Sequence, residues 1–227
     1  MLRKSLRGGM AAAIMTGMVL AAPAHADHNY AVTVTNLTNG MTFTPILVAS
    51  HRFEPHLLFN AGDAASAELA TVAEAGDVAP LTASLEAQSG VGGVTSSAAL
   101  LPNGLLLPGE SVTVEIKARP GRDRLSLVAM LIPTNDGFFA FQNLPLPRGR
   151  HASVVEYSPA YDAGSEPNDE LCMSIPGPTC GGQGSSPGVD GEGYVHIHRG
   201  IHGIGDLQPA VRDWRNPVTR VIISRTK

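Results

Sequence analysis

The sequence predicts an all-β fold, an antiparallel β-sandwich with one or two short helices in a loop excursion. Short runs of residues alternate between apolar and polar, which is the period of a strand with one buried face. The 25 Gly and 17 Pro residues stand mostly between these runs and favour turns over long helices. Roughly seven to nine short strands separated by turn signals are typical of a sandwich or a barrel.

The predicted strands differ in how evenly they alternate. Residues 30–35 and 111–116 alternate strictly, so each predicts a half-buried strand. Residues 125–133 are apolar almost throughout, as expected for a central strand that is covered on both faces. The remaining predicted strands are residues 43–49, 138–141, 153–157, 194–198 and 220–224.

The predicted helices lie in one excursion from the sandwich. Apolar residues recur at helical spacing within residues 64–75, and Gly76 stands where a glycine ends a helix. A second short helix is predicted within residues 81–88. The glycine-rich residues 90–93 predict a flexible loop before the strands resume.

The N-terminus has the pattern of a secretion signal. Three basic residues precede an uncharged apolar run at residues 10–22, and an Ala-x-Ala cleavage pattern ends at Ala26. The run is too short to span a membrane, which takes about 20 apolar residues. We therefore expect residues 1–26 to be a signal peptide, residues 27–227 to be one domain without a membrane span, and the protein to be secreted or periplasmic.

The charge of the remaining chain narrows the classes of partner. Three of the 16 basic residues and none of the 20 acidic residues lie in residues 1–26, so the rest carries a formal net charge of −7. Such a chain is poorly suited to nucleic acid or to an anionic membrane surface. It is well suited to binding cations.

The chain has two cysteines, Cys172 and Cys180. In an exported protein a disulfide across this short Pro- and Gly-rich loop is expected. The alternative is two free thiols. A bridge here would hold an irregular loop and would not replace the hydrophobic core.

Four segments of the chain carry a family resemblance. Residues 131–139 (LIPTNDGFF), 161–166 (YDAGSE), 193–206 (GYVHIHRGIHGIGD) and 213–221 (DWRNPVTRV) resemble segments of the spondin-domain family, including its secreted bacterial members. The resemblance implies a β-sandwich related to C2 domains. In animal members this is an extracellular matrix or adhesion module with a bound calcium ion. One departure is Gly137, where the family has a tryptophan.

The resemblance also implies a ligand set. Asp136, Asp162 and Glu166 match the three acidic metal positions of the family. Calcium takes six to eight oxygen ligands, and carboxylates on converging loops supply them. The alternative is that these residues are solvated acids in loops. Three neighbouring acids are predicted to be surface charges only: Asp169, Glu170 and Asp190.

A second cluster contains His196, His198 and His202. In a strand the first two point to the same face, so three imidazoles could bind Zn²⁺ or Cu²⁺, with Asp206 as a fourth or outer ligand. The alternative is that these histidines only form hydrogen bonds with the backbone or with carboxylates. Trp214 is predicted to be a buried anchor.

Two hypotheses about function follow. The first is a non-enzymatic, calcium-binding module of the binding or adhesion type, whose partner is an extracellular or periplasmic protein or glycan. The second is a metal-handling protein or metalloenzyme centred on the histidines. Residues 184–188 match G-x-S-x-G, but Pro187 follows the serine and has no N–H for an oxyanion hole, which excludes a nucleophile elbow.

Overall fold

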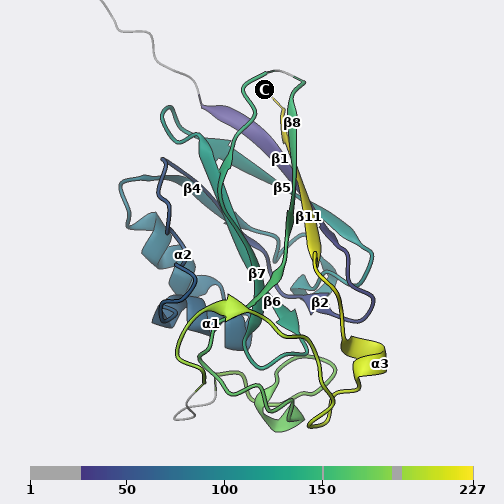
Figure 1. The fold of residues 1–227 in the computed structure, drawn as a ribbon. Helices are drawn as coiled ribbons and strands as arrows, with labels where there is room; N and C mark the ends of the chain where they lie inside the picture. Colours follow the sequence, from purple (N-terminus) through teal and green to yellow (C-terminus); the bar gives the residue numbers. More distant parts are fainter. Residues whose placement is uncertain (1–26, 150, 186–190, 227) are drawn as a thin grey trace, which may run out of the picture.

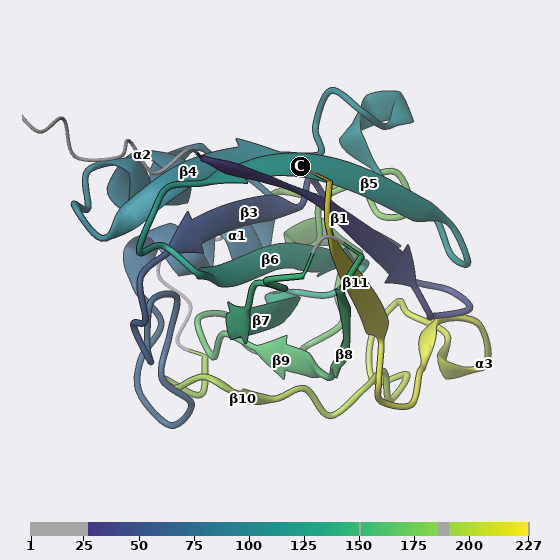
Figure 2. The same ribbon diagram turned by 90° about the horizontal axis from the view of Figure 1, so that it is seen from above.

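Two antiparallel sheets stack face to face in the computed structural model, which describes residues 27–149, 151–185 and 191–226 (Figures 1 and 2). The predicted signal peptide lies outside the described residues. The first sheet has the order β5-β1-β11-β8. Its strands are β5 (Ser111–Ala118), β1 (His28–Asn36), β11 (Thr219–Arg225) and β8 (Ser153–Ser158).

The second sheet is larger and has the order β10-β9-β7-β6-β3-β4, with β2 paired to β6. Every strand pair in both sheets is antiparallel, which confirms the all-β sandwich predicted from the sequence. The strands are β10 (His196–Ile197), β9 (Ala160–Asp162), β7 (Gly137–Pro145), β6 (Arg124–Ile132), β3 (Leu47–His51), β4 (Val91–Ser96) and β2 (Thr42–Phe43).

The hydrophobic core fills the space between the sheets. In β5 the side chains alternate between exposed and buried along the whole strand, as its sequence predicts. The core-facing residues of the first sheet include Val32, Val114 and Val221, and they pack against residues of the second sheet such as Phe43 and Phe139. Burial of these apolar side chains is the main contribution that holds the sheets together.

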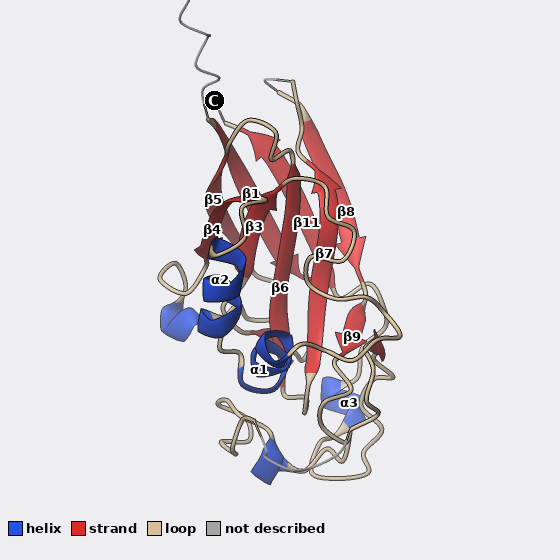
Figure 3. Cartoon of the chain, turned by 90° about the vertical axis from the view of Figure 1, so that its left-hand side faces the viewer, coloured by secondary structure: helices blue, strands red, loops and turns tan. Residues whose placement is uncertain are grey.

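The helices α1 (Ala67–Ala75) and α2 (Ala79–Glu86) cover the outer face of the second sheet (Figure 3). The Ser66 side chain caps the start of α1, and Gly76 ends it with a positive φ of 68°. Leu69 and Val72 on α1 join a second apolar cluster with Val128 of β6. The sheet is therefore buried on both faces, which explains why β6 is apolar almost throughout.

Residues 90–93 are a correction to the sequence prediction, because β4 begins at Val91 and the segment is not a flexible loop. Its glycines allow a close approach of the two sheets. A Cβ at Gly93 would lie 3.0 Å from the carbonyl oxygen of Lys117, in β5. The pattern of glycines here reflects packing, which sequence alone does not distinguish from flexibility.

The two ends of the sandwich differ in composition. At one end β1 begins and β11 ends, while the other end carries long loops (Figure 1). These loops hold the short helices η2 (Cys172–Ser174) and α3 (Pro209–Arg212) and the predicted disulfide Cys172–Cys180, which is confirmed. A further short helix, η1 (Pro102–Gly104), precedes β5. Within the described ranges no helix has the length and apolar character needed to cross a membrane.

Candidate metal centre

Strand register at one edge of the second sheet aligns residues from three separate parts of the chain. β9 lies between β7 and β10, and Asp162 pairs with Gly137 on one side and with His196 on the other. Residues directly opposed in this way have Cβ atoms about 4.5–5.5 Å apart. Because Asp136 precedes Gly137, the register brings Asp136, Asp162 and His196 to the loop end of the sandwich.

Asp136 lies in the turn between β6 and β7 and is fully buried. Its Oδ2 accepts hydrogen bonds from the backbone N–H groups of Ser165 at 2.8 Å and Glu166 at 3.0 Å, and from the Ser165 hydroxyl at 3.3 Å. Its Oδ1 is also buried and has no hydrogen-bond partner in the described part of the chain. An unsatisfied buried polar atom costs about 1–3 kcal/mol, and more when it is charged.

Asp162 is the second fully buried carboxylate. Its Oδ1 accepts a hydrogen bond from the N–H of Gly164 at 2.8 Å, and its Oδ2 accepts one from the Asn168 amide at 2.7 Å. The same amide donates to Oε1 of Glu192 at 3.0 Å. Among the described residues, no Lys or Arg forms an ion pair with Asp136 or Asp162.

The electrostatics of this pair are unfavourable without an added positive charge. Burial, together with the neighbouring charge of Asp162, raises the pKa of Asp136 to about 8. Burial also raises the pKa of Asp162, although hydrogen bonds from Asn168 and Gly164 act in the opposite direction. A divalent cation bound between the two carboxylates would supply the positive charge that no Lys or Arg of the described residues supplies.

Glu166 lies in the turn that follows β9, and its side chain is buried. Gly164 opens this turn with a φ of 65°, and a Cβ there would overlap the backbone of Tyr194. The three predicted calcium residues thus adjoin one tight turn. Their ligand atoms do not form a group, among the described residues, in which every pair lies within 4.8 Å. Calcium binding therefore stays a prediction.

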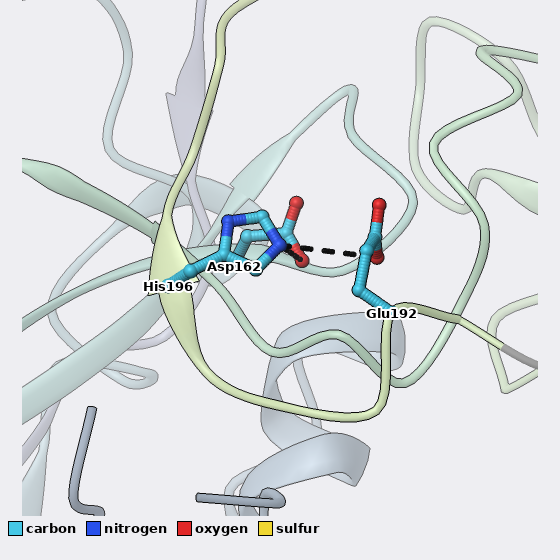
Figure 4. A group of neighbouring side chains, drawn as sticks. All are labelled: Asp162, Glu192 and His196. Carbon is cyan, nitrogen blue, oxygen red and sulfur yellow. Dashed lines mark ion pairs between the residues drawn. The ribbon is translucent and has the colours of Figure 1, made fainter. Parts of the chain in front are cut away.

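A different set of three residues does have ligand atoms that all lie within this distance of one another. Ligand atoms of Asp162, Glu192 and His196 all lie within 4.8 Å of one another (Figure 4). Nε2 of His196 is 3.6 Å from Oδ1 of Asp162 and 3.9 Å from Oε2 of Glu192. The dashed lines in Figure 4 show that the imidazole nitrogen faces both carboxylates.

The structure assigns different surroundings to the three predicted histidine ligands. β10 ends before His198, whose buried ring accepts a hydrogen bond from Gly200 N–H at 3.0 Å and lies 5.0 Å from the ring of Trp214. Burial, with nearby His196 and His202, lowers the pKa of His198 to about 3. Trp214 is buried, as predicted. His202 is exposed, and the three-histidine site stays a prediction.

The prediction of a mere surface charge is wrong for Glu170, which is 4% exposed. Its carboxylate accepts hydrogen bonds from three successive backbone N–H groups, those of residues 202–204. Asn135 accepts a hydrogen bond from Glu170 N–H at 3.2 Å and donates to Asp169 at 2.9 Å. These contacts fix the loop beside Asp136. Asp190 lies outside the described residues, and Asp206 accepts the N–H of Cys172.

The Spondin_N family model matches residues 26–166, more than half of the chain. The chain belongs to the spondin-domain family. Membership indicates an extracellular binding or adhesion-type module, and the disulfide suits an oxidising compartment. No curated protein matches the chain.

The structure explains how this spondin domain departs from the family at Gly137. A Cβ at this position would lie 2.6 Å from Oγ1 of Thr134 and 2.9 Å from Cδ2 of His198. Thr134 is fixed in place because its hydroxyl accepts the N–H of Gly137 at 2.9 Å. A tryptophan side chain therefore has no room here, because Thr134 and His198 occupy the adjacent space.

Three residues of the centre were not predicted from the sequence: Asn135, Asn168 and Glu192. Asn168 is six residues from Asp162 and contacts it across the turn after β9, whereas Glu192 comes close to Asp162 only because the chain folds back to pair β10 with β9. No spacing pattern connects residues that a loop of this length brings together. The asparagine between Pro167 and Asp169, directly after the acidic motif, was the one local signal.

Proposed function

We propose that this spondin-domain protein is a secreted or periplasmic, non-enzymatic binding module. A calcium ion bound by Asp136, Asp162 and Glu166 holds the loops at one end of its sandwich. These loops meet a protein or glycan partner outside the cytoplasm. The family supports the binding role, and the geometry of the buried acids supports the cation.

One observation carries the proposal: Asp136 and Asp162 are fully buried neighbours without a Lys or Arg partner among the described residues. Unpaired buried charges are strongly destabilising, so such groups are ordinarily protonated, paired or bound to a metal. Oδ1 of Asp136 has no other hydrogen-bond partner there and is available as a ligand.

The chemistry of these ligands favours calcium. Calcium accepts carboxylate and backbone carbonyl oxygens in flexible geometry at about 2.3–2.6 Å. Asp136 and Asp162 already hold the turn 164–166 through its backbone N–H groups. A cation on their other oxygens would therefore fix the turn relative to the strand ends.

Exposed apolar side chains beside the site support a binding surface at this end. Tyr194 and Ile197 flank His196 and are 46% and 51% exposed, and Ile204, in the loop held by Glu170, is 69% exposed. Large apolar side chains that gather in solvent-exposed loops are typical of an interaction surface. The cation would set the positions of the loops that carry them.

The proposal is tested by adding CaCl₂ to chelator-treated protein and measuring the melting temperature. If the dissociation constant is about 10⁻⁴–10⁻³ M, 10 mM calcium stabilises the fold by about 1.4–2.7 kcal/mol. This corresponds to a rise of about 3–10 °C for a domain of this size.

The matched variants for this test are Asp136→Asn and Asp123→Asn. Asp123 precedes β6 and is partly exposed, whereas Asp136 follows the same strand and is buried. We expect calcium to stabilise the wild-type protein and Asp123→Asn equally, and to leave Asp136→Asn unchanged. A wild-type melting temperature that does not change when calcium is added would refute the proposal.

A further inference from the structure

We propose that Asp162, Glu192 and His196 form a second cation site, which is selective for a borderline ion such as Zn²⁺. The site shares Asp162 with the proposed calcium centre, but it does not depend on calcium being bound. Glu192 and His196 lie beyond residues 26–166, which the family model matches.

The first step is the tautomer of His196. Its Nδ1 lies 3.0 Å from the carbonyl oxygen of Ile197, and a carbonyl oxygen can only accept a hydrogen bond. Nδ1 therefore carries a proton, so in the neutral form of the ring the lone pair is on Nε2. Nε2 is buried and has no hydrogen-bond partner among the described residues.

Nε2 of His196 faces two carboxylates. Oδ1 of Asp162 and Oε2 of Glu192 are its neighbours, at 3.6 and 3.9 Å. When Nε2 carries no proton, three electron-rich atoms face one another and repel, and a cation placed between them, either a proton on Nε2 or a metal ion, reverses the sign of the interaction. Figure 4 shows this convergence from a strand end and the adjoining loop.

The spacing of the ligand atoms around His196 is close to that of a tetrahedral zinc site. Zinc bonds to nitrogen and oxygen ligands are about 2.0–2.2 Å long, which places the ligand atoms of a tetrahedral site about 3.3–3.6 Å apart. The two distances from His196 are close to this range. Glu192 has a side chain that is 35% exposed, so it has room to close the remaining gap. Imidazole suits zinc, whereas calcium prefers oxygen ligands only.

The surroundings resemble those of metal ligands in general. A metal-bound histidine ordinarily donates its other ring N–H to a carbonyl or carboxylate, as His196 does to Ile197. Asn168 orients both acidic ligands, because its amide donates to Asp162 and to Glu192. Three protein ligands leave a fourth tetrahedral position for water.

The test is calorimetric titration of ZnCl₂ alone into chelator-treated full-length protein. We expect about one zinc ion to bind per chain. The variants His196→Ala and Glu192→Gln should each weaken zinc binding by about tenfold or more, since each removes a direct ligand. The control is His202→Ala, which removes an exposed histidine from the following loop and should leave zinc binding unchanged.

Two further measurements separate this site from the proposed calcium centre and from a simple ion pair. Asp136→Asn should keep zinc binding and lose calcium stabilisation, whereas His196→Ala should keep calcium stabilisation. Glu192→Gln guards against misfolding, because its side chain is partly exposed. Absence of zinc binding to the wild-type protein, an equal loss in His202→Ala, or a ring ¹⁵N spectrum with a proton on Nε2 throughout the zinc titration would each overturn the inference.

Discussion

Two aspartates at opposite ends of β6 show how differently the two ends of this molecule treat charge. Asp123, which precedes the strand, has a side chain that is 45% exposed and is paired with Arg148 at 3.0 Å and Arg124 at 3.7 Å. Asp136, which follows the strand, is fully buried and accepts hydrogen bonds only from neutral groups. The charge of Asp123 at the first end is balanced by the chain and by water, and the charge of Asp136 at the second end is not.

The balanced end contains a cleft of about 630 Å³ that is lined by several arginines. Arg225 donates to the carbonyl oxygen of Arg148 at 2.7 Å and contacts Nδ1 of His28 at 2.8 Å, so its position is set by the chain itself. The exposed ion pairs of Asp123 with Arg124 and Arg148 contribute little to the free energy of unfolding. Burial of a carboxylate, more than the number of charges, therefore identifies the end of the molecule where a bound cation would be stabilising.

The largest expected effect on stability comes from adding one methyl group to a glycine, and it should differ between the two ends of the molecule. Gly164→Ala adds a Cβ at a φ of 65° where it overlaps the backbone of Tyr194, whereas Gly121→Ala adds one at a φ of 77° with no atom within 4 Å. We expect Gly164→Ala to lower the free energy of unfolding by about 3 kcal/mol or more, and Gly121→Ala by about 1 kcal/mol. Urea denaturation measures both, and equal losses would contradict the packed turn.

The next effect is a dependence of stability on pH in chelator-treated protein. The pKa of Asp136 is raised from 3.8 to about 8, so between these values the folded state holds a proton that the unfolded state has lost. Stability from this group is therefore present at low pH and is lost as pH rises through the folded pKa. We expect a loss of about 2–4 kcal/mol between pH 5 and pH 8.

The same series in Asp136→Asn removes this contribution, while Asp162, whose pKa is also raised by burial, still titrates. The variant should therefore lose less stability than the wild-type protein between pH 5 and pH 8. The buried His198 changes stability in the opposite direction below its ordinary pKa, but it does so equally in both proteins. Parallel stability curves for the two proteins would argue against an uncompensated charge on Asp136.

The smallest effect is expected at the balanced end. Arg148→Ala removes the partner of Asp123, but the Arg148 side chain is 87% exposed and water replaces the lost contact. We expect the free energy of unfolding to change by less than about 1 kcal/mol, as for other exposed ion pairs. A loss above that value in thermal or urea denaturation would show that the two ends do not differ as described.

The sequence was sufficient for the sandwich because its strands carry strong local patterns. The alternation in β5 and the continuous apolar run of β6 correspond directly to one covered face and to two covered faces. The prediction of a flexible loop at residues 90–93 was wrong because glycine is common both in loops and where two segments pack closely. Burial of Glu170 was missed because its partners are backbone N–H groups more than 30 residues away.

The candidate site was only partly predictable for a similar reason. The family motifs located Asp136 and Asp162, since both stand within matched segments. Pairing of His196 with Asp162 depends on the register of β10 against β9, which no spacing in the chain encodes. The different surroundings of His198 and His196 likewise follow from the end of β10 and from the contact of His198 with the ring of Trp214.

The most direct test of the central claim is a crystal structure of the protein grown with calcium, with an anomalous difference map calculated for the ion. The account predicts a peak within about 2.3–2.6 Å of carboxylate oxygens of both Asp136 and Asp162. A well-ordered loop end with no peak at these oxygens, at pH 8 and with millimolar calcium, would contradict it.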